Sequence, residues 1–402
     1  MLKQRIYADN AATTKMSETA RKVFAENMEN NFGNASSLHS FGRNASVTLQ
    51  KSRETIAEYI NAEPQEVYFT SGGSESDNQA IITGAKYGAA KSKKHIVSSA
   101  IEHHSVLHPL DKLKKEGFEV TLLEVGRNGI VKPEDLARAI RDDTAFVTIL
   151  YANNEIGTIQ PIHEIGEICK ERQVLFHTDA VQAGGKINID VKERNIDLLS
   201  LAAHKFNGPK GTGILYCTKK IQPESIIGGG RQERSRRAGT ENIPAIAAMA
   251  AAFEENCLKM REHNAYVLKL RNKLIAELSK IPGSIVNGDM ENRIAGNVNM
   301  CFEGVEGESL LLMLDMKGIA ASSGSACTSG SLNPSHVLLA LGLPHEIAHG
   351  SLRLSLSHDN TEAEIDYIIE TVPGVIKYLR DMSPVWEKIE KGEEKSRIAE
   401  FK

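Results

Sequence analysis

The sequence has 402 residues, of which 41% are hydrophobic, 25% charged and 5% aromatic, and its formal net charge is −4. This composition is typical of a soluble globular protein of two or three domains, with no basic surface for nucleic acid or an anionic membrane. No apolar run approaches the ~18 residues of a membrane span, and the N-terminus lacks the apolar core of a signal peptide. We therefore expect a cytoplasmic protein that does not bind a membrane.

Strand and helix patterns alternate through the first half of the chain. Short apolar strands separated by helices of 10–12 residues predict βαβ units and a mainly parallel sheet. After a long helix the pattern mixes strands and helices, which predicts a second, smaller α+β domain, and the charged residues after Pro384 predict a solvated end. The predicted strands are 67–69, 95–99, 118–123, 145–151, 174–178, 197–202, 213–217, 283–286, 296–302 and 350–356; the predicted helices are 17–30, 43–60, one ending near 87, 104–115, 133–140, 161–172, 244–279, 307–316 and 361–379.

Lys205 follows the apolar strand 197–202 and precedes a Gly/Pro turn. A lysine at the end of a buried strand is costly unless it is paired or uncharged, and a lysine of depressed pKa forms Schiff bases with aldehydes. The alternative is a lysine whose charge reaches solvent from the turn. Lys210 lies in the turn itself, where we expect it to be solvated.

The other predicted strand ends carry further polar groups. Ser71-Gly72-Gly73-Ser74 suits a phosphate, or else caps a helix. His103 has a flat face for stacking on a ring, whereas the pair His104 and His108 has the i,i+4 spacing of metal ligands. Asn153 and Asn154 bind a ligand or cap a turn. Asp179 ends an apolar strand and pairs with a cation, either a protonated pyridine nitrogen or a structural partner.

Each of these motifs is ambiguous, but the set matches one cofactor. Pyridoxal phosphate needs an anion cradle, a stacking face, a charge for its ring nitrogen and an amine for its aldehyde. Lys205 and the strand-end motifs provide these four features in chain order.

Cys327 lies in S-S-G-S-A-C-T-S-G-S, residues 322–331, which are all small or polar and predict a mobile surface loop. A thiol there suits a nucleophile, and the alternative is an incidental surface cysteine. The other four cysteines, Cys169, Cys217, Cys257 and Cys301, fall in strand or helix patterns and are expected to be buried. Arg353 lies on an apolar strand and is suited to a carboxylate or a structural ion pair.

The ordered motifs resemble the NifS/IscS-type cysteine desulfurases, a class V branch of the fold-type I pyridoxal phosphate enzymes. The resemblance runs over almost the whole chain and depends on the order and spacing of its pieces. These pieces are A-D-N-A-A-T-T at 8–14, S-S-L-H at 36–39, T-S-G-G-S-E-S-D-N at 70–78, E-H-H-S-V at 102–106, N-N-E-I-G at 153–157, H-T-D-A-V-Q at 177–182, A-H-K-F-N-G-P-K-G at 203–211, R-A-G-T-E-N at 237–242, S-S-G-S-A-C-T-S-G at 322–330 and L-R-L-S at 352–355.

The resemblance implies a role for each matched residue. Lys205 would hold pyridoxal phosphate covalently, Cys327 would be the nucleophile that takes the sulfur, and His103 would be catalytic and stack on the ring. Arg353, helped by Asn154, would bind the substrate carboxylate. The implied cofactor-binding residues are Gly73, Ser74, His103, Asn154, Asp179, Gln182, Ala202, Ala203, His204, Lys205 and Thr240, with Asp179 on the ring nitrogen, Asn154 and Gln182 on the ring edge and phenolic oxygen, Gly73, Ser74 and His204 on the phosphate, and Thr240 arriving from the other subunit of a homodimer.

The sequence departs from the family pattern at two positions. Ala202 stands where the family often has a hydroxyl that donates to the phosphate, so we expect a weaker phosphate grip. Ala35 replaces a proline, so we expect a slightly looser loop.

The implied enzyme releases L-alanine from L-cysteine and leaves a persulfide on Cys327. A scaffold protein of the IscU/NifU type or another acceptor would take this sulfur for iron–sulfur cluster assembly or other thio-compounds, with Cys327 as a possible transient cluster ligand and no intrinsic metal. The implied fold has a large domain over 16–261, with a mainly parallel seven-stranded sheet, and a small domain over 1–15 and 262–402 that carries the Cys327 loop, about 321–333. The alternatives are a selenocysteine lyase, another class V aminotransferase, or a metal hydrolase built on His103, His104 and His108.

Overall fold

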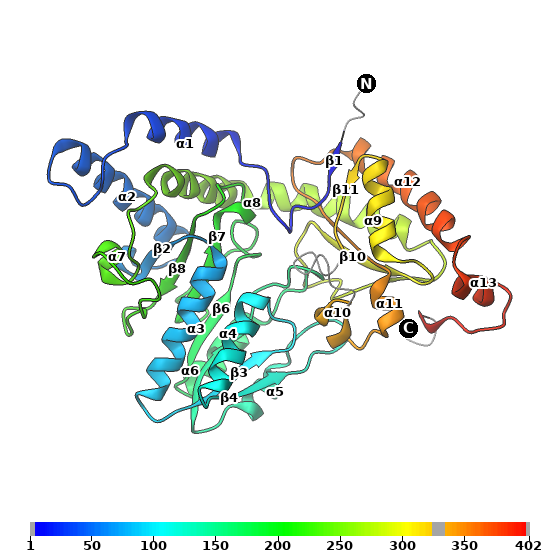
Figure 1. Cartoon of the computed structure of the whole chain (residues 1–402), viewed down its shortest axis with the longest axis horizontal. Helices are drawn as coiled ribbons and strands as arrows, with labels where there is room; N and C mark the ends of the chain where they lie inside the picture. The colour runs from blue at the N-terminus through cyan, green and yellow to red at the C-terminus, as the bar shows by residue number, and fades with distance from the viewer. Residues whose placement is uncertain (1–4, 324–333, 399–402) are drawn as a thin grey trace.

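A seven-stranded sheet is the largest element of the structure, a computed structural model that describes residues 5–323 and 334–398 (Figure 1). Its strand order is β2-β8-β7-β6-β5-β3-β4. β8 runs antiparallel to both of its neighbours and the remaining pairs are parallel, which confirms the predicted mainly parallel sheet. The strands are β2 (Val67–Thr70), β3 (His95–Ser99), β4 (Glu119–Leu123), β5 (Thr144–Thr148), β6 (Leu175–Asp179), β7 (Leu198–Ala202) and β8 (Gly213–Cys217).

Helices cover both faces of this sheet, which explains why its central strands are buried throughout. Ile96 and Phe146 pack in a cluster with α3 and α4, whereas the next residues along the same strands, Val97 and Val147, pack in a cluster with α2, α6 and α8. This alternation is the period of two expected for a strand between two layers. The helices of this part are α1 (Glu18–Asn30), α2 (Ser40–Tyr59), α3 (Gly73–Ala89), α4 (His104–Lys115), α5 (Pro133–Ala139), α6 (Ile162–Glu171) and the short α7 (Gln232–Ser235).

The 36-residue helix α8 (Ile243–Leu278) joins two hydrophobic cores. Its side chains over 246–253 pack in the core of the seven-stranded sheet, and those over 267–278 pack in a second core. The second core contains a three-stranded antiparallel sheet in the order β12-β10-β9 and a parallel pair of β1 with β11. The remaining elements of the chain are β1 (Ile6–Tyr7), β9 (Ser284–Val286), β10 (Asn297–Phe302), α9 (Gly307–Met316), β11 (Ile319–Ala320), α10 (His336–Ala340), α11 (His345–His349), β12 (Ser351–Ser355), α12 (Glu362–Arg380) and α13 (Pro384–Glu390). Of these, α10 and α11 pack in a separate cluster with residues of the larger part.

The N-terminal segment lies with the second core because β1 pairs with β11, more than 300 residues along the chain. The larger and smaller parts of the predicted fold are both present, and the exact boundaries at 15/16 and 261/262 stay predictions.

The prediction of a solvated tail after Pro384 is wrong in part. Residues 384–390 form α13, and the ring of Trp386 lies 3.5 Å from the Arg380 guanidinium. Ile398 is 2% exposed, and the Glu303 carboxylate accepts from the Ser396 hydroxyl and the Arg397 N–H. One aromatic and one aliphatic side chain therefore dock a segment whose composition is otherwise that of a solvated end.

Three of the four cysteines expected to be buried are buried, and Cys257 is only partly so. All four are free thiols. Among the described residues, none of the helices combines the length and apolar character that crossing a bilayer would need.

Candidate active site

Lys205 lies in the short 3-10 turn that follows β7, at the end of the large sheet. Its amine donates to the carbonyl oxygens of Ala11 and Ala12, at 2.6 and 2.9 Å. Lys210, the other candidate, is exposed as expected. The turn therefore keeps Lys205 half-buried with its amine bonded to the N-terminal segment, an environment that suits an amine reacting with an aldehyde.

Asp179 ends β6, which pairs with β7, and is 8% exposed. Burial raises the pKa of its carboxyl to about 6, while the Val181 amide, 2.9 Å from Oδ1, and the charge of Lys205 act in the opposite direction. A further cation beside Asp179 would favour its ionised form. This buried carboxylate fits the protonated ring nitrogen of pyridoxal phosphate.

His103 caps the N-terminus of α4 and contacts Ser105, which in turn bonds Asp77; sequence reasoning gave neither residue a role. Its Nδ1 accepts from the Ser105 backbone N–H at 3.1 Å and lies 2.6 Å from the Ser105 hydroxyl. That hydroxyl also donates to Asp77 Oδ2 at 2.6 Å. Burial and the charge of Lys205 lower the pKa of His103 to about 4, while burial and Asp179 raise the pKa of Asp77. The His103 ring is therefore neutral near pH 7, with a flat face suited to stacking.

Gly73 and Ser74 begin α3, where the first N–H groups have no partner within the helix. Gly72 occupies the cap position and offers no side chain to bond them. A Cβ at Gly73 would lie 2.6 Å from Val181 Cγ2, so glycine is needed for this close approach to the turn after Asp179. Free amides at a helix N-terminus next to that turn fit the phosphate of the cofactor.

The remaining residues predicted to contact the phosphate lie at the end of β7 and in the loop before α8. Ala202 and Ala203 are buried at the end of β7, and His204 Nδ1 lies 3.2 Å from the Thr13 hydroxyl. Burial and a neighbouring lysine lower the pKa of His204 to about 4. Thr240 is exposed in the loop before α8, and no hydrogen bond joins it to the other predicted residues in the described part of the chain. Its predicted role depends on a second subunit.

Two amides near the site are already engaged within the chain. Gln182 Nε2 donates to the Ala11 carbonyl at 2.9 Å, so the same segment is bonded to Gln182 and Lys205. Asn153 donates to the Ile101 carbonyl, and its Oδ1 accepts two N–H groups of the following turn. Of the two readings of Asn153, the structure therefore shows the turn cap.

Arg353 lies on β12 with its side chain 2% exposed. Its Nη2 donates to Asp9 Oδ1 at 2.9 Å and its Nη1 to the Asn154 carbonyl at 3.1 Å, while its buried Nε has no hydrogen-bond partner in the part of the chain described. The backbone of Asn154, and not its amide, makes this contact. The structure shows the structural ion pair that was the alternative for Arg353. Its partner, Asp9, was not predicted, although Asp9 belongs to the A-D-N-A-A-T-T motif.

Cys327 lies outside the described residues, but the described residues on each side of it are anchored beside the site. The Ser322 backbone exchanges two hydrogen bonds with that of Arg353. On the other side, the Ser335 hydroxyl donates to the Glu155 carboxyl, and His336 Nε2 lies 2.9 Å from the Glu102 carbonyl.

The histidines of the metal-hydrolase alternative do not form a metal site in the described part of the chain. The rings of His104 and His108 stack with centroids 5.0 Å apart, and His104 lies 4.8 Å from His336. Nowhere among the described residues are three His, Cys, Asp or Glu side chains grouped to hold a metal ion.

Comparisons with known proteins agree with this geometry. The family model of the class V aminotransferases matches residues 6–368. The chain is 52% identical over 383 residues to a cysteine desulfurase IscS of Methanosarcina thermophila, with 95% of each chain covered. Among solved structures, a NifS-like protein matches with a TM-score of 0.87, 35% identity and coverage of 93% of this chain and 100% of that chain. A structure of SspA in complex with cysteine matches with a TM-score of 0.76, 33% identity and coverage of 89% and 100%. The chain therefore belongs to the class V aminotransferase family of pyridoxal phosphate enzymes, and within it to the cysteine desulfurases.

Proposed function

We propose that this enzyme takes the sulfur of L-cysteine onto Cys327 and releases L-alanine, with Lys205 as the residue that holds pyridoxal phosphate. The observation that carries the proposal is the meeting of the Lys205 amine, the buried Asp179 carboxyl and the neutral His103 ring at the ends of neighbouring elements. Pyridoxal phosphate, when bound, stores the electron pair left by the departing α-proton.

The protein's side chains supply the rest of the chemistry. Asp179 would hold a negative charge against the ring nitrogen, and the N–H groups of Gly73 and Ser74 would hold the phosphate. Lys205 Nζ would carry the α-proton once the substrate amine has replaced it. A neutral His103 would face the ring without a competing charge, because burial lowers its pKa to about 4.

Arg353 would bind the substrate carboxylate, and Cys327 would attack the substrate sulfur. An S–S bond forms, the C–S bond breaks with its electron pair left on carbon, and protonation of that carbon gives L-alanine. Ser322 is hydrogen-bonded to the Arg353 backbone, and five residues of extended chain span at most ~18 Å. That length allows the Cys327 thiol to reach a substrate held by Arg353.

We further propose a homodimer. Large apolar side chains are exposed around the start of α2, where the rings of Phe32 and Phe41 lie 5.3 Å apart. An exposed apolar group of this kind marks an interface. A second subunit would cover it and bring Thr240 to the phosphate. The exposed side chains are Met28, Phe32, Leu38, Phe41 and Val47.

The sulfur acceptor is proposed to be a scaffold of the IscU/NifU type in iron–sulfur cluster assembly, or another thiol protein. Free thiols in the described part of the chain favour a reducing, cytoplasmic compartment.

Mass spectrometry after treatment with L-cysteine tests the proposal. We expect one added sulfur atom on Cys327, and a yellow Cys327→Ala variant that releases no sulfide with cysteine and a thiol reductant. Cys257→Ala is the matched control, since this partly buried thiol is expected to be dispensable. Sulfur on another cysteine, or normal turnover by Cys327→Ala, would refute the assignment of the nucleophile.

A parallel assay with selenocysteine separates the desulfurase from the lyase alternative. A selenocysteine lyase would act on selenocysteine and would be inactive on cysteine. Lys205→Ala should abolish turnover with either substrate.

A further inference from the structure

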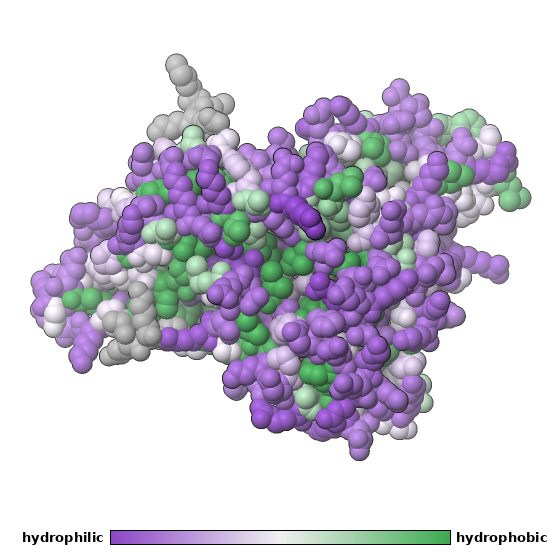
Figure 2. Space-filling view, turned by 180° about the vertical axis from the view of Figure 1, so that it is seen from behind, coloured by the Kyte–Doolittle hydropathy of each residue, from purple (hydrophilic) through white to green (hydrophobic). Residues whose placement is uncertain are grey.

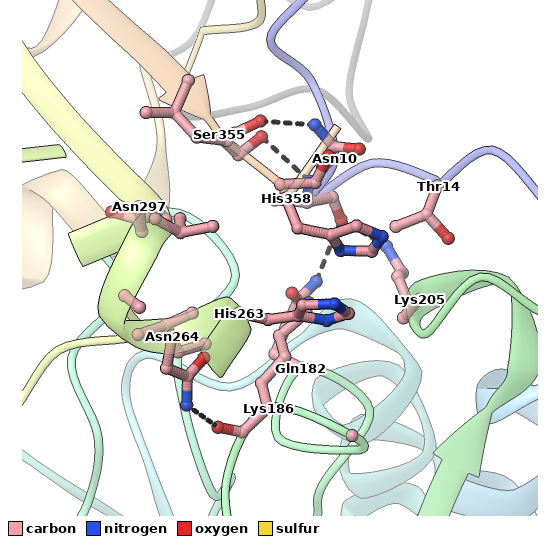
Figure 3. A pocket seen from close by; sticks show the side chains of 18 of the residues that line it. Asn10, Thr14, Gln182, Lys186, Lys205, His263, Asn264, Asn297, Ser355 and His358 are labelled. Carbon is pink, nitrogen blue, oxygen red and sulfur yellow. Dashed lines mark hydrogen bonds between the residues drawn. The ribbon is translucent and has the colours of Figure 1, made fainter. Parts of the chain in front are cut away.

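A small cavity of about 70 Å³ lies behind Lys205, between the large sheet and the second core (Figure 3). Its walls come from the N-terminal segment, the turn after β6, the middle of α8, the residues before β10 and the loop after β12. Asn264 on α8 donates to the Lys186 carbonyl at 2.8 Å, and Asn10 donates to the Ser355 carbonyl at 2.9 Å. These bonds fix the walls to one another.

Basic side chains line the cavity: Lys186, Lys205, His263 and His358. Among the described residues, no Asp or Glu lines it. The nearest acids to the two histidines lie outside the lining: Asp359 is 3.9 Å from His358 Nε2, and Glu255 and Glu262 act on His263 from α8.

Lys186 is the basic group of the cavity whose charge has the least support from nearby acids. In the described part of the chain no carboxylate lies within 4.0 Å of its amine, and burial, with the charge of Lys205, lowers its pKa to about 7. Lys186 is half-buried by solvent exposure, and a cation partly withdrawn from water without a counter-charge is costly. An anion in the cavity would remove this cost and favour the protonated amine.

The two histidines form the opposite wall. Their rings are parallel, with centroids 3.9 Å apart and planes at 11°. His263 belongs to α8 and His358 to the loop after β12, so each ring comes from a different element. Burial and the neighbouring ring lower the pKa of His263, and neutral imidazoles still offer N–H donors to an anion.

This cavity is not the proposed cofactor site. Of the described residues assigned to the cofactor or the substrate, only Lys205 and Gln182 line it. Lys205 reaches it because its amine bonds Ala11 and Ala12 in this structure. With Lys205 engaged by the cofactor, Lys186 remains as the cation of the cavity.

We propose that the cavity binds a small oxyanion, a carboxylate or a phosphate, between Lys186 and the His263–His358 pair. The ligand would contact the turn after β6, α8 and the loop after β12 together, and would stabilise the packing of the two cores. The proposal is independent of the desulfurase reaction, because it needs neither Cys327 nor Arg353.

Calorimetric titration of the cofactor-loaded enzyme with inorganic phosphate, and separately with acetate, tests the proposal at constant ionic strength. We expect saturable binding of at least one anion, and at least a tenfold loss of affinity in Lys186→Gln. Lys210→Gln, which removes an exposed lysine, should bind as the parent does. Comparing the affinities for phosphate and acetate shows which charge and size of anion the cavity prefers.

A second measurement covers the case in which Lys186→Gln does not fold. Crystals of the parent soaked in selenate should show anomalous density within hydrogen-bond distance of Lys186 and His358, and His358→Ser should weaken binding of the anion. Absence of saturable binding, or an anion located elsewhere, would overturn the proposal.

Discussion

Glu102 offers a quantitative test of the electrostatics around the site. Its side chain is fully buried, with Oε1 accepting from the Ser99 hydroxyl at 2.6 Å and the Leu150 N–H at 3.0 Å. Oε2 has no hydrogen-bond partner among the residues described. Burial raises the pKa of this carboxyl from 4.5 to about 8. The folded protein therefore holds a neutral acid here at neutral pH.

The sign of the pH dependence follows from this raised pKa. Below pH 4.5 both the folded and the unfolded chain bind the proton, and Glu102 does not affect how stability changes with pH. Between pH 4.5 and 8 only the folded chain binds it, so the free energy of unfolding falls as pH rises. A shift of about 3.5 pKa units corresponds to ~5 kcal/mol, which relaxation of the site reduces.

Glu102→Gln removes this dependence because the amide stays neutral. The amide oxygen can take the place of Oε1 and accept the same two hydrogen bonds. The NH₂ group is left without a partner, at a cost of about 1–3 kcal/mol. We expect the variant to be less stable than the parent at pH 5 and more stable at pH 8.

Urea unfolding of both cofactor-loaded proteins at several pH values between 5 and 8 measures the difference. Asp77 and Asp179 also titrate, but they contribute to both proteins and largely cancel. The exposed Glu116→Gln is a matched control for the loss of a carboxylate. If the difference in the free energy of unfolding between Glu102→Gln and the parent stays constant over this pH range, Glu102 is ionised in the folded protein and the reasoning is refuted.

Two further predictions concern the residues that contact the predicted catalytic groups. Ser105→Ala leaves Asp77 Oδ2 without its hydroxyl donor and should lower the free energy of unfolding by about 1–3 kcal/mol, more at pH 8 than at pH 5 because the lost bond favours the charged carboxyl. Thermal unfolding at both pH values measures this, together with the histidine NMR signal of His103, and an unchanged signal would contradict the contact. Asp9→Asn removes the counter-charge of Arg353 and should destabilise the free enzyme by about 3 kcal/mol. L-Alanine, whose carboxylate replaces that charge, should raise the melting temperature of Asp9→Asn more than that of the parent, and equal shifts would contradict this.

The sequence predicted the large sheet well because its signals are local. Each central strand is short and has apolar residues at its centre, and the glycines and polar residues after it mark the strand end. The ends of parallel strands meet at one edge of a sheet, so Asp179 and Lys205 could be placed near each other from chain order alone.

The missed features depend on contacts between distant residues. β1 and β11 have two residues each and pair across more than 300 positions, which leaves no periodic signal. The docking of the C-terminal tail depends on Trp386 over Arg380, on the buried Ile398 and on hydrogen bonds to Glu303. The Asp9–Arg353 pair is separated by 344 positions. Arg353 stood out on its apolar strand, but nothing in the sequence near it identified Asp9 as its partner.

The N-terminal segment connects these missed contacts with the site. Its Ala11 carbonyl accepts from both Gln182 and Lys205, and its Asp9 carboxylate pairs with Arg353. Main-chain carbonyls make the first two contacts, so a side-chain pattern could not reveal them. In this structure the segment therefore accepts a hydrogen bond from the amine that is proposed to hold the cofactor. It also forms an ion pair with the guanidinium that is proposed to hold the substrate. Under the proposed mechanism, each group would exchange at least one of these partners before it acts. We expect the free energy of those exchanges to contribute to how tightly the cofactor and the substrate are bound.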